Sequence, residues 1–253
     1  MRIPKLLPAV DLIDGTVVRL QQGDYDRRTN FTVNPAEVLK RYVNEGATQL
    51  HLVDLSGAKD TRKRQTALIA SLVKELSVTI EVGGGIRSES DVEALLNAGV
   101  SRVVIGSLAV KKPEAVKALF KRFGGETIVL ALDVSLDSKG DAYVATDAWQ
   151  SVSSVRIEDV IDRFAPLGLQ YVLCTDIARD GMLKGANTEL YRKLCGQYPA
   201  IGFIASGGIG SLDDIRALAG LGLDSIIVGR ALLENRFTVK EALRCLPNES
   251  LRV

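Results

Sequence analysis

The second half of this chain repeats the pattern of the first, which restricts the folds open to it. VGGGIRSESDVEALLNAGVSRVVIGS (82–107) and ASGGIGSLDDIRALAGLGLDSIIVGR (205–230) are identical at nine of 26 positions at an offset of 123 residues. At an offset of 122, the matched pairs are Gly46 with Gly168, Asp54 with Asp176, Ala9 with Ala131 and Asp11 with Asp133. Self-similarity at a fixed spacing is typical of folds built from repeated units. We therefore expect two homologous halves, about 1–124 and 125–253.

Within each half, short runs of β-branched residues alternate with amphipathic stretches. The strand-like runs are Ile3–Asp11, Gln49–Asp54, Thr79–Val82, Arg102–Ile105, Thr127–Asp133, Gln170–Cys174, Ile201–Ala205 and Asp224–Val228. The helical patterns are Pro35–Glu45, Arg64–Leu76, Ser90–Ala98, Pro113–Phe123, Ile157–Phe164, Thr188–Cys195, Leu212–Ala219 and Val239–Cys245. Eight strand–helix units in 253 residues suit a parallel barrel. The sequence thus predicts an α/β fold, a single (β/α)8 TIM barrel over 1–253 built from two half-barrels.

Composition and charge exclude several classes of partner. The chain has 32 basic and 31 acidic residues, a net charge of +1, which gives no reason to expect nucleic acid or an anionic membrane. No apolar run approaches the ~18 residues of a membrane span. The N-terminus meets Asp11 too early for a signal-peptide core. Three widely spaced cysteines, Cys174, Cys195 and Cys245, suit buried thiols in a reducing cytosol, so we expect a cytoplasmic protein.

Glycine-rich turns follow the strands on opposite sides of the predicted barrel. In such barrels the chemistry sits at the C-terminal ends of the strands. The residues there are Gly84, Gly85, Gly106 and Ser107 in the first half and Gly207, Gly208, Gly229 and Arg230 in the second. Glycines let the backbone approach an anion, and N–H groups at helix starts bind phosphate oxygens. The alternative is that they only form tight turns. Two such sites predict an elongated substrate with a phosphate at each end.

Aspartates also end or follow several predicted strands: Asp11, Asp54, Asp133, Asp176 and, in the loop CTDIARDGMLKG, Asp180. Burial raises the pKa of a carboxyl group towards the working pH of a general acid or base. Aspartate also caps turns and helices. We expect a supporting or capping role for Asp54 and Asp176, and catalysis for Asp11, Asp133 and Asp180.

Eight motifs together resemble the ProFAR isomerase family of histidine biosynthesis. They are LPAVDLIDGTVVRLQQGDY (7–25), LHLVDLSGAKD (50–60), EVGGGIRS (81–88), VVIGS (103–107), LALDV (130–134), CTDIARDG (174–181), ASGGIG (205–210) and IIVGRALLE (226–234). The resemblance covers nearly the whole chain. It implies a cofactor-free and metal-free enzyme, a monomer, that rearranges a bisphosphorylated aminoaldose into an aminoketose.

The resemblance also implies roles for single residues. Asp11 would be the general base that removes the C2′ proton of the ribose. The general acid that opens the furanose would be Asp180 or Asp133; we favour Asp180, with Asp133 and Thr175 positioning the groups. Arg19 and Arg87 would contact the substrate, and Trp149, the only tryptophan, would stack on its imidazole ring. One departure is Met182, where the family usually has threonine.

Two other features receive structural interpretations. His51 is the only histidine, which excludes a histidine metal cluster and a Ser-His-Asp triad, and its position within a strand predicts a packed or hydrogen-bonded role. The basic run Lys59–Arg64 is interpreted as a solvated loop; a nucleic-acid patch or closure over the substrate are the alternatives.

Three competing functions remain in view. The cyclase subunit of imidazole glycerol phosphate synthase shares the half-barrel repeat, but that family typically has cysteine at Ala9 and lysine at Arg19. A bifunctional isomerase would also act on phosphoribosylanthranilate, and loop sequence separates it poorly. A barrel that only binds phosphorylated ligands is disfavoured, because buried carboxylates near phosphates are electrostatically costly.

Overall fold

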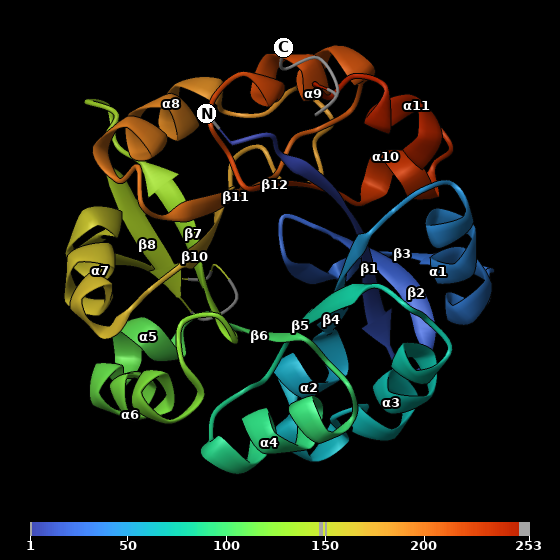
Figure 1. Ribbon diagram of the computed structural model, residues 1–253, viewed down its shortest axis with the longest axis horizontal. Coiled ribbons are helices and arrows are strands. Elements are labelled where there is room, and N and C mark those ends of the chain that lie inside the picture. Colours follow the sequence, from blue (N-terminus) through green and yellow to red (C-terminus); the bar gives the residue numbers. More distant parts are fainter. Residues whose placement is uncertain (1, 147–148, 150, 248–253) are drawn as a thin grey trace.

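Eight parallel strands close into a barrel in the computed structural model, which describes residues 2–146, 149 and 151–247 (Figure 1). The barrel strands are β1 (Lys5–Ile13), β4 (Gln49–Asp54), β5 (Thr79–Gly83), β6 (Arg102–Ile105), β7 (Ile128–Leu136), β10 (Tyr171–Asp176), β11 (Gly202–Ser206) and β12 (Ser225–Val228). Each pairs with its neighbour in chain order, β7 pairs with β10, and β12 returns to β1. The predicted (β/α)8 TIM barrel is therefore confirmed.

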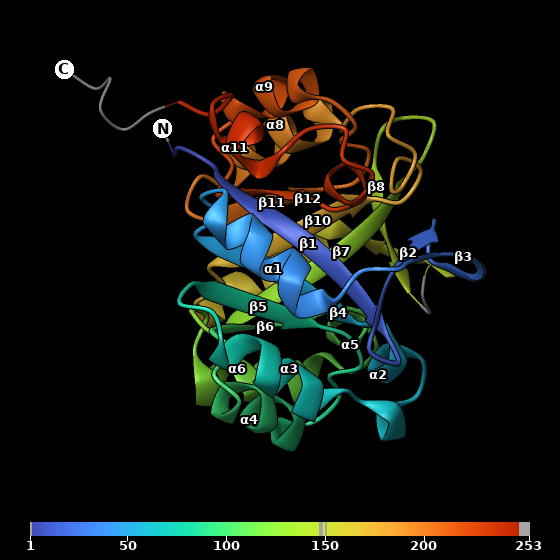
Figure 2. The same cartoon turned by 90° about the vertical axis from the view of Figure 1, so that its right-hand side faces the viewer.

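Helices surround the barrel on its outer face (Figures 1 and 2). The longer ones are α1 (Pro35–Asn44), α3 (Thr66–Lys74), α4 (Glu89–Asn97), α6 (Pro113–Phe123), α7 (Ile157–Phe164), α8 (Thr188–Gln197) and α9 (Leu212–Ala219). The shorter ones are α2 (Leu55–Lys59), α5 (Leu108–Lys111), α10 (Arg230–Leu233) and α11 (Val239–Leu243), with 3-10 turns at Thr61–Lys63 and Ala165–Leu167. The predicted ranges for α6, α7 and α9 match these bounds. Among the described residues, no helix is both long and apolar enough to cross a membrane.

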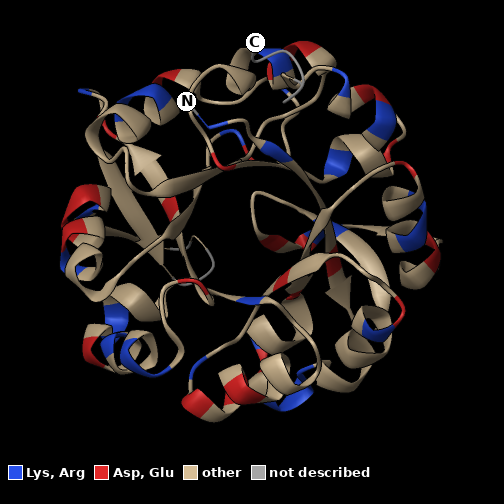
Figure 3. Cartoon of the chain, viewed as in Figure 1, with Lys and Arg blue, Asp and Glu red and all other residues tan. Residues whose placement is uncertain are grey.

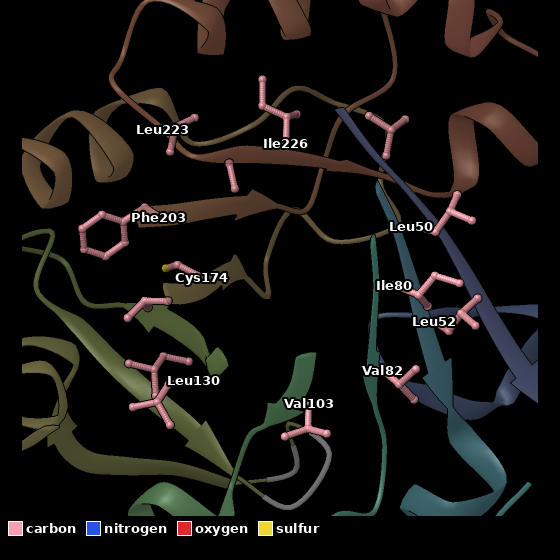
Figure 4. Close-up of a cluster of buried hydrophobic side chains, with 14 of the residues drawn as sticks. Leu50, Leu52, Ile80, Val82, Val103, Leu130, Cys174, Phe203, Leu223 and Ile226 are labelled. Atoms are coloured by element: carbon pink, nitrogen blue, oxygen red, sulfur yellow. The ribbon is translucent and has the colours of Figure 1, made fainter. Parts of the chain in front are cut away.

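Alternation along the strands creates two apolar layers. Outward-facing side chains such as Leu50, Ile80 and Leu130 pack under the helices in one extended cluster (Figure 4). A smaller cluster fills the barrel interior: Leu7, Ala9, Val104, Val129, Leu173, Ile204 and Ile227. Because the interior is packed, a ligand can reach the barrel only at its mouth.

Two antiparallel hairpins extend the barrel, and the sequence prediction missed both. β2 (Thr16–Gln21) and β3 (Asp24–Phe31) continue from β1 and project from one end of the barrel (Figure 2). β8 (Ala142–Thr146) and β9 (Ser151–Arg156) continue from β7. Asp14-Gly15 joins β1 to β2 and Gln22-Gly23 joins β2 to β3; all four residues have positive φ, which suits tight hairpin turns. A search for strand–helix units overlooked these strand–turn–strand signals.

The same local devices recur in both halves. Ser88 caps α4 in a capping box with Asp91, and Ser211 caps α9 in the same way with Asp214, 123 residues later. Lysine, arginine, aspartate and glutamate are interspersed around the outer helices, without segregation into faces of one sign (Figure 3).

Candidate active site at the barrel mouth

The predicted catalytic residues converge at the C-terminal ends of the strands. Asp11 lies near the end of β1, Thr175 near the end of β10, and Asp180 in the loop that follows β10; all three are buried. Asp133 on β7 is opposite Thr175 on β10 in the parallel register. Residues separated by up to 169 positions thereby share one small volume, as a barrel of parallel strands requires.

Arg19 on β2 links two of these carboxylates. Its Nη1 donates to Asp11 Oδ2 at 3.0 Å, and its Nη2 lies 2.5 Å from both carboxylate oxygens of Asp180. Burial raises the pKa of Asp11; Arg19 opposes that rise and the charge of Asp180 adds to it. Burial alone would lower the pKa of Arg19, but Asp180 and Asp11 raise it above its ordinary value. The β2–β3 hairpin thus places one permanent cation between two buried acids.

Asp133 has a different environment. Trp149 Nε1 donates to Asp133 Oδ2 at 2.7 Å, and the Thr175 side chain also hydrogen-bonds to this carboxyl. Burial raises the pKa of Asp133, and the two hydrogen bonds oppose the rise. Asp133 is therefore held by neutral donors, whereas Asp11 and Asp180 are held by a cation. The indole of Trp149 is tied to the mouth through Asp133.

The glycine turns of the second half line a pocket. It has an empty volume of about 350 Å³, is open to solvent, and is bordered by Ala9, Arg19, Asp180, Gly181, Leu183, Ser206, Gly207, Gly208, Ile209, Ile227, Gly229 and Arg230. Arg230 reaches it from the start of α10, where its Nη1 donates to the Gly181 carbonyl at 2.5 Å and its Nε lies 2.6 Å from Glu234. The pocket joins the predicted second phosphate site to the Arg19–Asp180 pair.

The glycines of these turns fall into two groups, and each half contributes to both. A Cβ on Gly84, Gly85 or Gly208 would lie less than 3.0 Å from a backbone carbonyl of Asp54, Gly57 or Gly185, respectively, and all three have positive φ. Backbone packing alone explains these three. A Cβ on Gly229 would meet only ordinary contacts, 3.7 Å from Ala9 Cβ, and one on Gly106 would be equally unhindered. The absence of a side chain at Gly229 therefore keeps the pocket open.

Some first-half residues lie apart from this pocket. Gly106 and Ser107 are placed at the start of α5, after β6. Arg87 Nη2 is 3.4 Å from the Ala58 carbonyl, and Arg87 lines a separate open depression beside the β2–β3 hairpin. The other basic residues of that depression are Arg28, Lys59, Arg62 and Lys63. Arg87 therefore lies outside the pocket that Arg19 borders, and its predicted contact with the substrate stays a prediction.

Asp54 and Asp176 have the supporting role that the sequence predicted. Asp54 accepts from the backbone N–H of Gly57 and of Gln65, and from the Gln65 amide at 2.8 Å. Asp176 accepts from the backbone N–H of Ala178 at 3.0 Å and from Asn187 Nδ2 at 2.8 Å. Gln65 and Asn187 are again 122 residues apart. Both carboxylates brace a loop behind the mouth.

Sequence reasoning missed some residues of the pocket. Ser206 and Leu183 both border it. Met182, the departure from the family pattern, lies beside Gln21, and the Gln21 amide nitrogen is 3.9 Å from the Met182 sulfur. Ser206 immediately precedes Gly207-Gly208, so its position in the motif was an available signal. No sequence pattern indicated Leu183, which enters through a positive-φ turn in the loop after β10.

Fold and site together define the class: a (β/α)8-barrel protein with buried acids and an open, glycine-lined pocket at its mouth. A sequence profile described as histidine biosynthesis protein matches residues 5–238. The chain belongs to this family of histidine-biosynthesis enzymes, which includes both ProFAR isomerases and cyclase subunits of imidazole glycerol phosphate synthase.

Proposed function

We propose that this protein is the aldose–ketose isomerase of the family, which converts ProFAR into its aminoketose PRFAR by an Amadori rearrangement. The observation that carries the proposal is the arrangement of Asp11 on β1 and Asp180 in the loop after β10, which approach one guanidinium at 3.0 and 2.5 Å. Two carboxyl groups so placed suit a reaction that gives a proton to one atom of a substrate and removes one from another.

In this proposal the reaction starts with Asp180 as the general acid. Asp180 protonates the ring oxygen of the furanose, the bond from that oxygen to C1′ breaks, and C1′ becomes part of a protonated imine. Asp11 then removes the proton from C2′, and the electron pair forms an enolamine. Tautomerisation of the enolamine produces the ketone at C2′, so no redox cofactor, metal or co-substrate is required.

The remaining groups bind and orient the substrate. Arg19 Nε is buried without a hydrogen-bond partner among the described residues, so it is free to donate to a substrate oxygen. Arg230 and the backbone at Gly207, Gly208 and Gly229 receive one phosphate, and the turns at Gly84, Gly85, Gly106 and Ser107 receive the other. Asp133, Thr175 and Trp149 fix the position of the imidazole carboxamide.

The test is a spectrophotometric assay of purified protein with ProFAR in the presence of chelator and without ammonia or cofactor. Conversion to the aminoketose is expected. If ProFAR stays unchanged but PRFAR is consumed once ammonia is added, the cyclase function replaces the proposal. A parallel assay with phosphoribosylanthranilate separates a dedicated from a bifunctional isomerase. Ligand binding without turnover of any of these compounds would contradict the proposal.

A further inference from the structure

A buried tyrosine on α8 reaches the strand ends behind the pocket. Tyr191 lies in the first turn of α8, and its side chain is fully buried. Its hydroxyl lies 2.9 Å from the Cys174 carbonyl and 2.7 Å from the Ser206 carbonyl, to either of which it can donate, and it accepts from the Ser206 N–H at 3.0 Å. Burying a hydroxyl group is unfavourable unless it is hydrogen-bonded, and this one both donates and accepts. The mechanism proposed above gives Tyr191 no role.

The two strands that this hydroxyl contacts, β10 and β11, are neighbours in the barrel. In their register Thr175 is opposite Ser206, and the Gly202 N–H donates to the Gln170 carbonyl at the start of the pair. The regular alternation of a parallel ladder then brings the Ser206 N–H towards the Cys174 carbonyl. Because β11 ends at Ser206, the hydroxyl binds the last backbone groups before the two strands separate.

Both strand ends lead directly into the candidate active site. Cys174 immediately precedes Thr175, which belongs to the mouth. Ser206 borders the pocket and precedes the Gly207-Gly208 turn. This turn also rests on the end of β10, because a Cβ on Gly207 would lie 3.2 Å from the Asp176 carbonyl. The position of the glycine turn therefore depends on the spacing between β10 and β11, and the Tyr191 hydroxyl contacts both strands.

An apolar residue stands at the position of this tyrosine in the first half. The residue 122 positions before Tyr191 is Ile69, which is buried on α3. An isoleucine side chain cannot hydrogen-bond, so Ile69 supports the ends of β4 and β5 by apolar packing alone. The polar contact thus belongs to the half whose glycine turn borders the pocket with Arg19 and Asp180.

We propose that Tyr191 is a positioning residue for phosphate binding: its hydroxyl fixes the spacing of β10 and β11 behind Ser206 and so holds the Gly207-Gly208 turn in the conformation that receives a phosphate. Tyr191 does not itself border the pocket, so it acts through Ser206. The kinetic consequence rests on the isomerase function proposed above. The effect on the strand ends does not, because it is a property of the protein without ligand.

The first experiment measures amide hydrogen exchange by NMR in the wild type, Tyr191→Phe and Tyr42→Phe. Tyr191→Phe removes only the hydroxyl, so we expect the Ser206 amide to exchange about tenfold faster relative to the Ile204 amide on the same strand. Tyr42→Phe is the matched control. Tyr42 is also buried on a barrel helix, but its hydroxyl has no hydrogen-bond partner among the described residues. Equal relative protection of Ser206 in the wild type and Tyr191→Phe would overturn the proposal.

The second experiment titrates inorganic phosphate and follows the amide resonances of Gly207 and Gly208. We expect phosphate to shift both resonances in the wild type. The Kd should rise about tenfold in Tyr191→Phe and stay unchanged in Tyr42→Phe. An unchanged Kd in Tyr191→Phe would overturn the proposal, and so would the absence of any phosphate-dependent shift in the wild type.

The third experiment uses steady-state kinetics with ProFAR to separate positioning from stability. Tyr191→Phe should raise KM about tenfold and leave kcat within about twofold, because a phosphate contact acts on the ground state and the transition state alike. Loss of folded protein alone would lower kcat at unchanged KM, which would contradict the proposal. If the wild type binds phosphate but does not convert ProFAR, the isomerase function fails, and the exchange and phosphate experiments still decide the role of Tyr191.

A measurement on the wild type covers the case in which Tyr191→Phe does not fold. A buried, hydrogen-bonded hydroxyl proton exchanges slowly with water and gives its own NMR signal. The proposal requires such a signal for Tyr191, with a nuclear Overhauser contact to the Ser206 amide. A hydroxyl proton that exchanges rapidly and lacks this contact would overturn it.

Discussion

Asp54 in the first half and Asp176 in the second each brace the loop after a strand, with the amide of Gln65 or Asn187 as partner. Beyond these braces the two loops diverge. After β4 the chain forms the short helix α2, which contains Ala58. The residue of the second half that corresponds to Ala58 is Asp180, whose side chain reaches Arg19 at the mouth. The comparison shows that both halves have the bracing aspartate, whereas only the second half has an acid, Asp180, in the loop that this aspartate braces.

The walls of the mouth differ in the same way. Ser107 in the first half corresponds to Arg230 in the second, and only Arg230 lines the pocket with Asp180. Asp11 and Asp133 correspond to each other, yet Asp11 faces Arg19 and Asp133 faces Trp149. A symmetric framework thus supports an asymmetric site, which suits a reaction in which one group gives a proton and another removes one.

The largest expected effect comes from Asp11→Asn. Loss of the general base should lower kcat by about 10³-fold, and the substrate affinity should stay within about tenfold because the phosphate contacts remain. Steady-state kinetics together with calorimetric binding measure both quantities. Asp14→Asn is the control, since Asp14 is an exposed aspartate in the turn that follows β1. Near-normal turnover of Asp11→Asn would remove Asp11 from the base role.

Asp180→Asn and Asp133→Asn then test the asymmetry directly. Asp180 has no acidic counterpart in the first half, where Ala58 stands at its position. If Asp180 is the acid, its loss should lower kcat by at least about tenfold more than the loss of Asp133. Single-turnover rates at saturating substrate check this. The opposite order would assign the acid to Asp133 and make the repeat-related pair the catalytic one.

The next effect separates the two kinds of glycine. Gly208→Ala should destabilise the protein by about 3 kcal/mol, because the new Cβ meets the Gly185 carbonyl and φ is positive. Gly229→Ala should fold normally and raise KM about tenfold, a loss of about 1.4 kcal/mol of binding. Urea denaturation and steady-state kinetics distinguish the two variants. Equal stability losses would mean that Gly229 is also a packing glycine.

The smallest effect concerns stability against pH. Because the pKa of Asp133 is raised in the folded state, its ionised form destabilises the fold above that pKa and costs nothing below the unfolded value. Asp133→Asn should therefore stabilise the protein by about 1 kcal/mol at pH 7.5, and the gain should vanish towards pH 4. Asp11→Asn should show a gain of the same sign, because burial also raises the pKa of Asp11 although Arg19 opposes the rise. Urea midpoints at the two pH values provide the check, and a gain at both for Asp133→Asn would refute this account.

Much of the framework could be predicted from the sequence. The ranges of β4, β6, α6, α7 and α9 were correct, because alternating and helical periodicities persist through them. Asp54 and Asp176 were correctly separated from the mouth acids. The hairpins β2–β3 and β8–β9 were missed, because the prediction looked for strands followed by helices and each hairpin is a strand followed by another strand.

By itself, the sequence determined the barrel, the location of the mouth and the set of acids that gather there, because these follow from local periodicity and from the rule that parallel strands end on one face. Only the tertiary structure decided which groups face each other. Arg19 meets Asp180 across 161 positions, Arg87 turns to a separate depression, and His51 lies beneath Asp11 beside Glu81. Such contacts depend on strand register and on the course of the hairpins, and no local pattern encodes either.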